Sequence, residues 1–228
     1  MQTAGNDYHL GHPGTVTATG TGWAEAPPDL MLVSIGAESR AAAVAGAYSA
    51  AGEALEAVAA AFRAHGTAAA DIRTTGLTVR ADLVWREGEG QRVAGYVAAG
   101  TLDVRLRDMA SAAGVISEAV TAGGNDVRLN SLHLDLADDT QARERARAAA
   151  WEDALRTGQQ FAMLASATLG RVVSVVEHGP AQGPVPLVGL QRASAVESVA
   201  IEPGQNRVQA AVTVVWELGP ARQEGTGG

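Results

Sequence analysis

The chain opens with two stretches in which apolar and polar residues alternate, the pattern of half-buried β-strands. Residues 15–25 are small or β-branched, and they stop before Pro27 and Pro28, which cannot donate hydrogen bonds within a sheet. In the stretch that follows, the apolar residues of one face are Met31, Val33, Ile35 and Ala37. The pattern predicts two consecutive strands separated by a proline break.

The apolar spacing then changes to steps of three and four residues, which places the side chains on one side of an α-helix. The stripe consists of Val44, Tyr48, Ala51, Leu55, Val58 and Phe62. His65 and Gly66 follow it, and glycine is the residue that most readily takes the left-handed conformation at a helix end. We therefore expect one helix that ends at this pair.

Two further alternating runs flank residues 87–90, a Glu-Gly-Glu-Gly turn. The first run places on one face Leu77, Val79, Ala81, Leu83 and Trp85, and the second run places on one face Leu102, Val104 and Leu106. The opposite face of the first run is half polar, with Thr78, Arg80, Asp82, Val84 and Arg86. The sequence predicts a β-hairpin.

After the hairpin, the apolar spacing predicts a short helix and then another strand. Asp108 belongs to the residue types favoured at helix N-termini, and we expect the helix to begin there. Gly123 and Gly124 interrupt the pattern and end the helix. Residues 127–136 alternate again and predict a strand.

A long helix and two strands complete the predicted order. Asp138 and Gln141 have the spacing of a capping box, which opens a helix that we expect to run to about Leu169. Residues 171–177 form a short apolar strand. In the last strand, Val212 and Val214 are predicted to be buried. Thr213 and Glu217 are predicted to lie on the other face.

The resulting order, ββαββαβαββ, indicates the α+β class, with an antiparallel or mixed sheet and helices packed on one face. Strand–helix–strand–strand over residues 30–106 recurs over residues 127–218, which suggests two βαββ units. We expect one domain over residues 15–218, with a variable, proline-rich loop at 178–204. Flexible tails are predicted at residues 1–14 and 219–228.

Composition narrows the chemistry. The 228 residues include no cysteine, and all 17 basic residues are arginine, which excludes disulfides, a cysteine nucleophile and a Schiff-base lysine. The net charge of −8 disfavours unspecific binding to nucleic acid and to anionic membranes. No long apolar stretch predicts insertion into a membrane. No export signal is recognised near the N-terminus, and we expect a cytoplasmic location.

Two patterns bear on chemistry. His133 and Asp135 lie two residues apart on the same face of a predicted strand, a spacing that suits a metal site or a His–Asp pair. Because no other histidine is near in sequence, a solvent-facing strand surface is the favoured interpretation. Residues 143–147 hold three arginines, but five acids and four arginines over residues 138–156 favour a salt-bridged helix face over a nucleic-acid surface. From the residues we assign no catalytic, cofactor-binding or metal-binding residue.

Four stretches follow one another in an order and at a spacing that match a known family. They are the glycine-rich strand, proline break and second strand of residues 16–39, the heptapeptide of residues 71–77, Gly95-Tyr96 with residues 101–108, and Glu202-Pro203-Gly204 before the last strand. Together they resemble the SIMPL domain family, also called DUF541, over roughly residues 15–218.

The resemblance implies an α+β fold without established catalytic residues, metal or cofactor. Bacterial members are similar to envelope or periplasmic antigens and to proteins linked with oxidative-stress tolerance, some assemble into ring-like homo-oligomers, and animal members are kinase-pathway adaptors. We therefore expect a non-enzymatic, self-assembling scaffold or adaptor with a stress-response role. Its expected partners are further copies of the chain, held by sheet edges or faces, and an unidentified protein.

Two alternative functions remain open from the sequence. One is a hydrolase, with or without a metal, that uses His133 and Asp135. The other is a carrier that holds a small ligand in an apolar pocket between sheet and helices.

Overall fold

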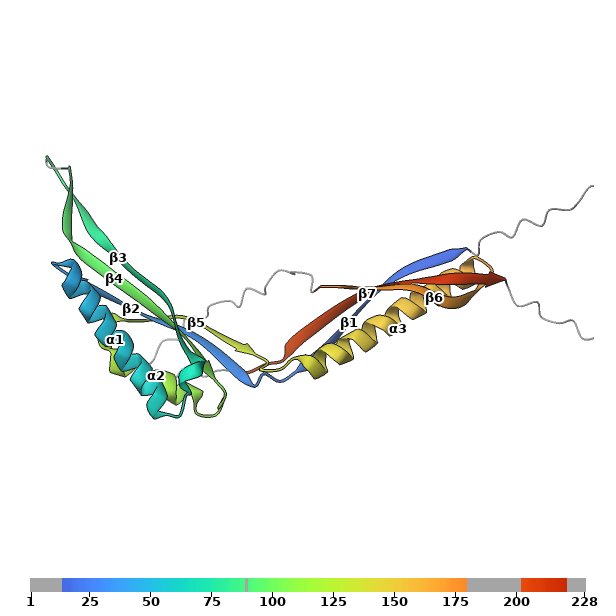
Figure 1. Ribbon diagram of the computed structural model, residues 1–228, viewed down its shortest axis with the longest axis horizontal. Coiled ribbons are helices and arrows are strands. Elements are labelled where there is room, and N and C mark those ends of the chain that lie inside the picture. The colour runs from blue at the N-terminus through green and yellow to red at the C-terminus, as the bar shows by residue number, and fades with distance from the viewer. Residues whose placement is uncertain (1–13, 89, 180–201, 221–228) are drawn as a thin grey trace, which may run out of the picture. The chain divides into compact units, whose positions relative to one another are not determined.

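The computed structural model describes residues 14–88, 90–179 and 202–220 (Figure 1). Within these ranges the helices and strands follow the predicted order, and the α+β class is confirmed. They form two compact units, each with a sheet of its own. One unit is built mainly from residues 27–137, and the other from the chain before and after that segment.

The unit of residues 27–137 contains four strands, two helices and two short 3₁₀ turns. In chain order these are β2 (Leu30–Ala41), α1 (Val44–Ala64), η1 (Ala69–Asp71), β3 (Ile72–Arg86), β4 (Gly90–Leu106), α2 (Ala112–Gly123), η2 (Gly124–Asp126) and β5 (Val127–Asp135). The strand order is β3-β4-β2-β5, and each neighbouring pair is antiparallel. Helices α1 and α2 lie together on one face of this sheet (Figure 1).

Strand β2 lies inside the sheet and carries the centre of the core. The residues predicted to share its buried face are at most 2% exposed: Met31, Val33, Ile35 and Ala37. From α1, Leu55, Val58 and Phe62 belong to the same cluster. The two large residues at the start of the predicted helical stripe are instead about half exposed, Val44 at 47% and Tyr48 at 52%.

Alanines replace these residues at the contact between the first turns of α1 and the sheet. Ala47 and Ala51 are fully buried and cluster with Ala98 of β4. Methyl groups let the helix approach the strand closely, and the bulkier Val44 and Tyr48 are left at the margin of the contact. The spacing therefore predicted the helix and the burial of Ala51, but it placed Val44 and Tyr48 on the buried side, where Ala47 lies instead.

The turns predicted from glycines are confirmed. Gly66 takes a φ of +83° after the end of α1. Gly88 and Gly90 take φ values of +80° and +74° where β3 turns into β4. Each is a left-handed conformation that residues with a side chain adopt at a cost.

The second unit contains β1 (Thr15–Ala26), α3 (Thr140–Leu164), β6 (Ala167–His178) and β7 (Asn206–Pro220). Its sheet has the order β1-β7-β6, and α3 packs on one face. The register predicted for the last strand is confirmed, because Val212 and Val214 are buried while Thr213 and Glu217 lie on the other face. Beside them, the ring of Trp216 packs against Trp151 of α3, with centroids 6.2 Å apart.

The two βαββ units suggested by the sequence exist, but the second one uses a different first strand. In the first unit, three consecutive strands of the sheet have the order β3-β4-β2. In the second unit, the three strands have the corresponding order β6-β7-β1. Strand β1 thus takes the place in the second unit that β2 takes in the first. Strand β5, predicted to begin the second unit, pairs with β2 instead.

The contact between α3 and β1 is a close approach of two backbones. Every fourth residue of α3 is small and buried: Ala142, Ala146, Ala150, Ala154, Gly158 and Ala162. This row lies on Gly20 and Gly22 of β1, where an added Cβ would be 2.2 Å from a backbone atom of Ala150. No side chain fits between helix and strand at this separation.

Side chains of α3 also bond to the backbone of β1, which is a terminal strand of its sheet. The carboxylate of Asp153 accepts a hydrogen bond from the Thr21 N–H at 3.0 Å. The guanidinium of Arg145 donates to the carbonyl oxygen of Glu25 at 3.2 Å. The helix therefore satisfies backbone groups that a strand edge would otherwise leave open to another chain.

Both predicted N-terminal caps form turns that precede their helices. Asp108 accepts a hydrogen bond from the Ser111 hydroxyl at 2.7 Å, and α2 begins only at Ala112. Asp138 accepts from the Thr140 N–H at 2.9 Å, and α3 begins at Thr140 without a capping box. Short polar side chains favour such local turns over helix interiors.

The predicted end of α3 is also wrong. The helix stops at Leu164, and Ser166 takes a positive φ of 54°. Ala167 already pairs with Pro220 across β6 and β7, so the segment up to Leu169 is strand. Pairing with the last strand overrides the helical tendency of this segment.

The predicted tails at 1–14 and 219–228 and the predicted loop at 178–204 lie mostly outside the described residues. Where they enter the described ranges, strand β6 ends at His178 and strand β7 continues to Pro220.

A glycine-to-alanine pair of variants tests the contact between α3 and β1. Gly20→Ala places a methyl group 2.2 Å from backbone atoms, so we expect the free energy of unfolding to fall by about 3 kcal/mol or more. Gly52→Ala is the control, because Gly52 is an exposed helical residue with no atom within 4 Å of the added methyl. It should leave stability unchanged or raise it by up to about 1 kcal/mol. Urea denaturation measures both, and equal effects would contradict the described contact.

Candidate functional site

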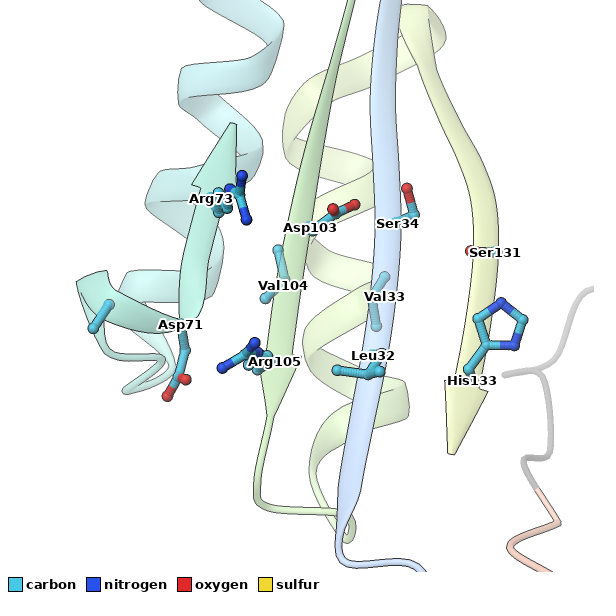
Figure 2. A pocket seen from close by; sticks show the side chains of 11 residues that line it. Leu32, Val33, Ser34, Asp71, Arg73, Asp103, Val104, Arg105, Ser131 and His133 are labelled. Atoms are coloured by element: carbon cyan, nitrogen blue, oxygen red, sulfur yellow. The ribbon is translucent and has the colours of Figure 1, made fainter. Parts of the chain in front are cut away.

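A polar depression of about 390 Å³ lies on the four-stranded sheet, on the face opposite α1 and α2 (Figure 2). All four strands contribute to it. The upper row in Figure 2, from strand to strand, is Arg73, Asp103, Ser34 and Ser131, which the strand register places directly opposite one another. The second row is Asp71, Arg105, Leu32 and His133.

The alternation of β2 explains which residues line this depression. Because Val33 points into the core, Leu32 and Ser34 must face the opposite side of the sheet. Ser34 and Ser131 are short and lie between the long side chains of the arginines and the ring of His133. The hollow is the space that the two serines leave unfilled.

Asp71 is committed to a structural ion pair at the edge of the depression. Its carboxylate accepts two hydrogen bonds from Arg107, at 3.1 Å from Nε and 3.0 Å from Nη2. These bonds lower the pKa of Asp71, and the charges of Arg107 and Arg105 act in the same direction against the opposing effect of burial. The same hydrogen bonds raise the pKa of Arg107. The pair joins η1 to the end of β4.

The His133 and Asp135 pair predicted as a possible catalytic or metal site is not assembled. His133 lies in the depression opposite Leu32, whereas Asp135 lies at the end of β5 opposite Leu30. The Asp135 carboxylate accepts the Leu136 N–H at 2.8 Å, and no hydrogen bond joins it to His133. Over residues 14–88, 90–179 and 202–220, no three His, Cys, Asp or Glu side chains are grouped to hold a metal ion.

Two of the three arginines in residues 143–147 form ion pairs, which agrees with the salt-bridged helix face that the sequence favoured. Arg143 of α3 pairs with Asp139, the residue just before the helix. The Nε of Arg147 donates to Glu177 of β6 at 2.8 Å, a bond that raises the pKa of the arginine and lowers that of the glutamate. These side chains serve the packing of α3 on its sheet.

An apolar groove in the three-stranded unit is the feature that corresponds to the ligand-carrier hypothesis. The groove has a volume of about 320 Å³ and lies between α3 and the strands β6 and β7. Trp151, Val175 and Val212 line it, and the Arg147–Glu177 pair lies at its border.

A stripe of apolar side chains on the β3–β4 hairpin is a second candidate site. Leu77, Val79, Leu83 and Trp85 share one face of β3, as predicted, but they are 38–78% exposed. Val93 lies opposite Leu83 and is 56% exposed. We call these five residues the hairpin stripe.

The hairpin stripe is uncovered because of where α1 lies. The helix packs over β4 and β2 and reaches only the margin of β3. The end of the hairpin extends past α1 without a helix above it (Figure 1). Exposed apolar patches of this kind are typical of surfaces that bind another protein.

The sequence did not single out the charged residues of the depression. Asp103 and Arg105 lie on the second strand of the predicted hairpin, and alternation with Leu102 and Val104 gives the face on which they lie. Arg73 precedes the first predicted run, and the irregularity between Thr74 and Gly76 reverses the facing that alternation from Leu77 would give it. Their meeting with Ser34 and His133 depends on how β2 pairs with β4 and β5. A single sequence carries no signal for that pairing.

The chain is thus an α+β protein of two βαββ units whose described residues include a polar depression, an apolar groove and an apolar hairpin stripe. It belongs to the SIMPL family, described as a protein of unknown function (DUF541), which matches residues 16–216.

Curated relatives are similar over most of their length. A "26 kDa periplasmic immunogenic protein" of Brucella melitensis biotype 1 is 27% identical over 217 residues, covering 90% of this chain and 85% of the relative. The uncharacterized protein YggE of Escherichia coli strain K12 is also 27% identical, over 212 residues that cover 92% of this chain and 85% of YggE.

These relatives correct the expected location. A protein of the same name from Brucella abortus strain S19 matches equally well, so two of the relatives are named as periplasmic. The expectation of a cytoplasmic location, drawn from the composition near the N-terminus, is therefore wrong. None of the helices in the described ranges has the length and apolar character needed to cross a membrane.

The Asp71–Arg107 pair predicts a pH dependence of stability. A carboxyl whose pKa is lower in the folded than in the unfolded chain stabilises the fold above its unfolded pKa of about 3.9, and this stabilisation is lost as the pH falls through the folded value. Asp71→Asn should therefore unfold at lower urea than the wild type at pH 7, and the difference should shrink below about pH 4. Arg107→Gln should show the same trend. A difference that stays constant from pH 7 to pH 2 would contradict the account.

Proposed function

We propose that this protein is a non-enzymatic scaffold of the bacterial periplasm that assembles with copies of itself through the β3–β4 hairpin. The observation that carries the proposal is the hairpin stripe, which places four large apolar side chains on a terminal strand of the sheet. Burial of such side chains against another subunit is favourable by roughly 25 cal/mol per Å² of apolar surface.

The edge position of β3 supports assembly in a second way. On its outer side β3 has no neighbouring strand among the described residues. A strand edge offers unpaired N–H and C=O groups to another chain, and natural proteins commonly cover or interrupt such edges. The edge of β1 is covered by Asp153 and Arg145 of α3, whereas no helix side chain bonds to the β3 backbone in the described ranges. The contrast favours β3 over β1 as the edge used for assembly.

The location in the proposal comes from the relatives named as periplasmic. Absence of cysteine is compatible with that compartment, because no thiol is present to be oxidised there. Only the family resemblance supports a stress-response role. We propose that the scaffold acts under such stress.

Charge placed in the hairpin stripe tests the proposal. Wild-type protein should scatter light as a multiple of 23.2 kDa at micromolar concentration. Leu83→Asp with Trp85→Ser should shift the mass toward 23.2 kDa, because a carboxylate in the contact would lose its hydration without a partner. Both residues are exposed, so the stability of the subunit should change by about 0.5 kcal/mol or less.

The matched control is Thr78→Asp, which places the same charge on the opposite face of the same strand. It should keep the wild-type mass. A wild-type mass that stays at 23.2 kDa on concentrating the sample would reject assembly. Equal dissociation by Thr78→Asp would reject the hairpin stripe as the contact.

A further inference from the structure

The polar depression contains charged side chains that form no hydrogen bond or ion pair with the described residues. Arg73, Asp103 and Arg105 make no hydrogen bond or ion pair with any described residue, although Arg73 and Asp103 lie opposite each other on neighbouring strands. Asp71 beside them is fully engaged by Arg107. The three groups are thus one carboxylate and two guanidinium groups, with Arg73 opposite Asp103 on the neighbouring strand and Arg105 two residues along the same strand.

The same face of the sheet behaves differently away from the depression. Arg40 lies 3.4 Å from Glu38 and 3.7 Å from Asp82, and Arg80 lies 3.7 Å from Glu38. Charged residues elsewhere on this surface therefore pair along β2 and across β4. The open arrangement of the depression is a local feature and not a general property of the sheet face.

The arrangement of charge favours a ligand that carries both signs. An anion alone would meet the carboxylate of Asp103 near the arginines, and a cation alone would meet the two guanidinium groups. A compact zwitterion satisfies both, with its carboxylate accepting charge-assisted hydrogen bonds from a guanidinium and its ammonium donating to Asp103. Any transient pair between Arg73 and Asp103 is exposed and weak, so a ligand can replace it at little cost.

Shape supports the same class of ligand. At about 390 Å³ the depression lies in the range of small-molecule sites. Ser34 and Ser131 leave room beside the charged groups and offer hydroxyls, and His133 bounds the far side (Figure 2). From these observations we infer that the depression binds a free α-amino acid, with its ammonium at Asp103, its carboxylate at Arg73 or Arg105, and its side chain over the two serines.

Equilibrium dialysis of the full chain with radiolabelled L-alanine tests this assignment and is independent of the oligomeric state. L-alanine should be retained saturably. Acetate and methylammonium each carry only one of its two charged groups, so each should compete at least about tenfold less well than unlabelled L-alanine. Asp103→Asn and Arg73→Gln should each weaken retention about tenfold or more.

Arg80→Gln is the matched control, since it removes an exposed arginine from the same strand and face outside the depression. It should leave retention unchanged within about twofold. Absence of saturable retention would overturn the inference. Acetate or inorganic phosphate that competes as well as L-alanine, together with no loss in Asp103→Asn, would show a simple anion site and would overturn it as well.

Discussion

The close contact between α3 and β1 is the constraint on which the arrangement of the chain depends. Glycines at positions 20 and 22 let the alanine row of α3 approach the strand backbone directly, and an added methyl group would collide with that backbone. This contact joins a strand near the start of the chain to a helix more than a hundred residues later. It makes residues 27–137 an insertion within the sequence of the other unit and gives β1, rather than β5, the first place in the second βαββ unit.

Coverage by helices decides which surfaces are left for function. In the described ranges each sheet has helices on one face only, and in the four-stranded unit α1 reaches only the margin of β3. Two surfaces of different chemistry result, the apolar hairpin stripe on the helix side and the polar depression on the opposite face. Because they occupy opposite faces of one sheet, assembly through the stripe leaves the depression accessible from its own side.

Local patterns in the sequence predicted the strands and helices well, but they predicted less well which residues the neighbouring elements bury. Alternation placed Met31 and Val33 in the core and Val212 and Val214 on the buried side of the last strand, because the two-residue period of a strand fixes the facing of every side chain. The same alternation put Leu83 and Trp85 on one face. It gave no warning of their exposure, because burial depends on where a helix lies.

The depression shows the same limit. Arg73, Asp103, Ser34 and His133 belong to four strands, and they meet through pairings that join residues far apart in the sequence. Likewise, the end of α3 was misplaced because β7 draws Ala167 into a strand. Residue patterns carry local preference, whereas these features come from pairing between distant segments.

Hydrogen–deuterium exchange at two protein concentrations tests the central claim, that the β3–β4 hairpin is the contact between subunits. Light scattering first fixes one concentration at which the protein is assembled and one at which it is dissociated. On assembly, the exchange rates of the amides in residues 76–86 should fall at least about tenfold. The amides of β2 already lie inside the sheet, so their exchange rates should not change. Unchanged exchange over residues 76–86 in the assembled protein, with new protection elsewhere, would contradict the account.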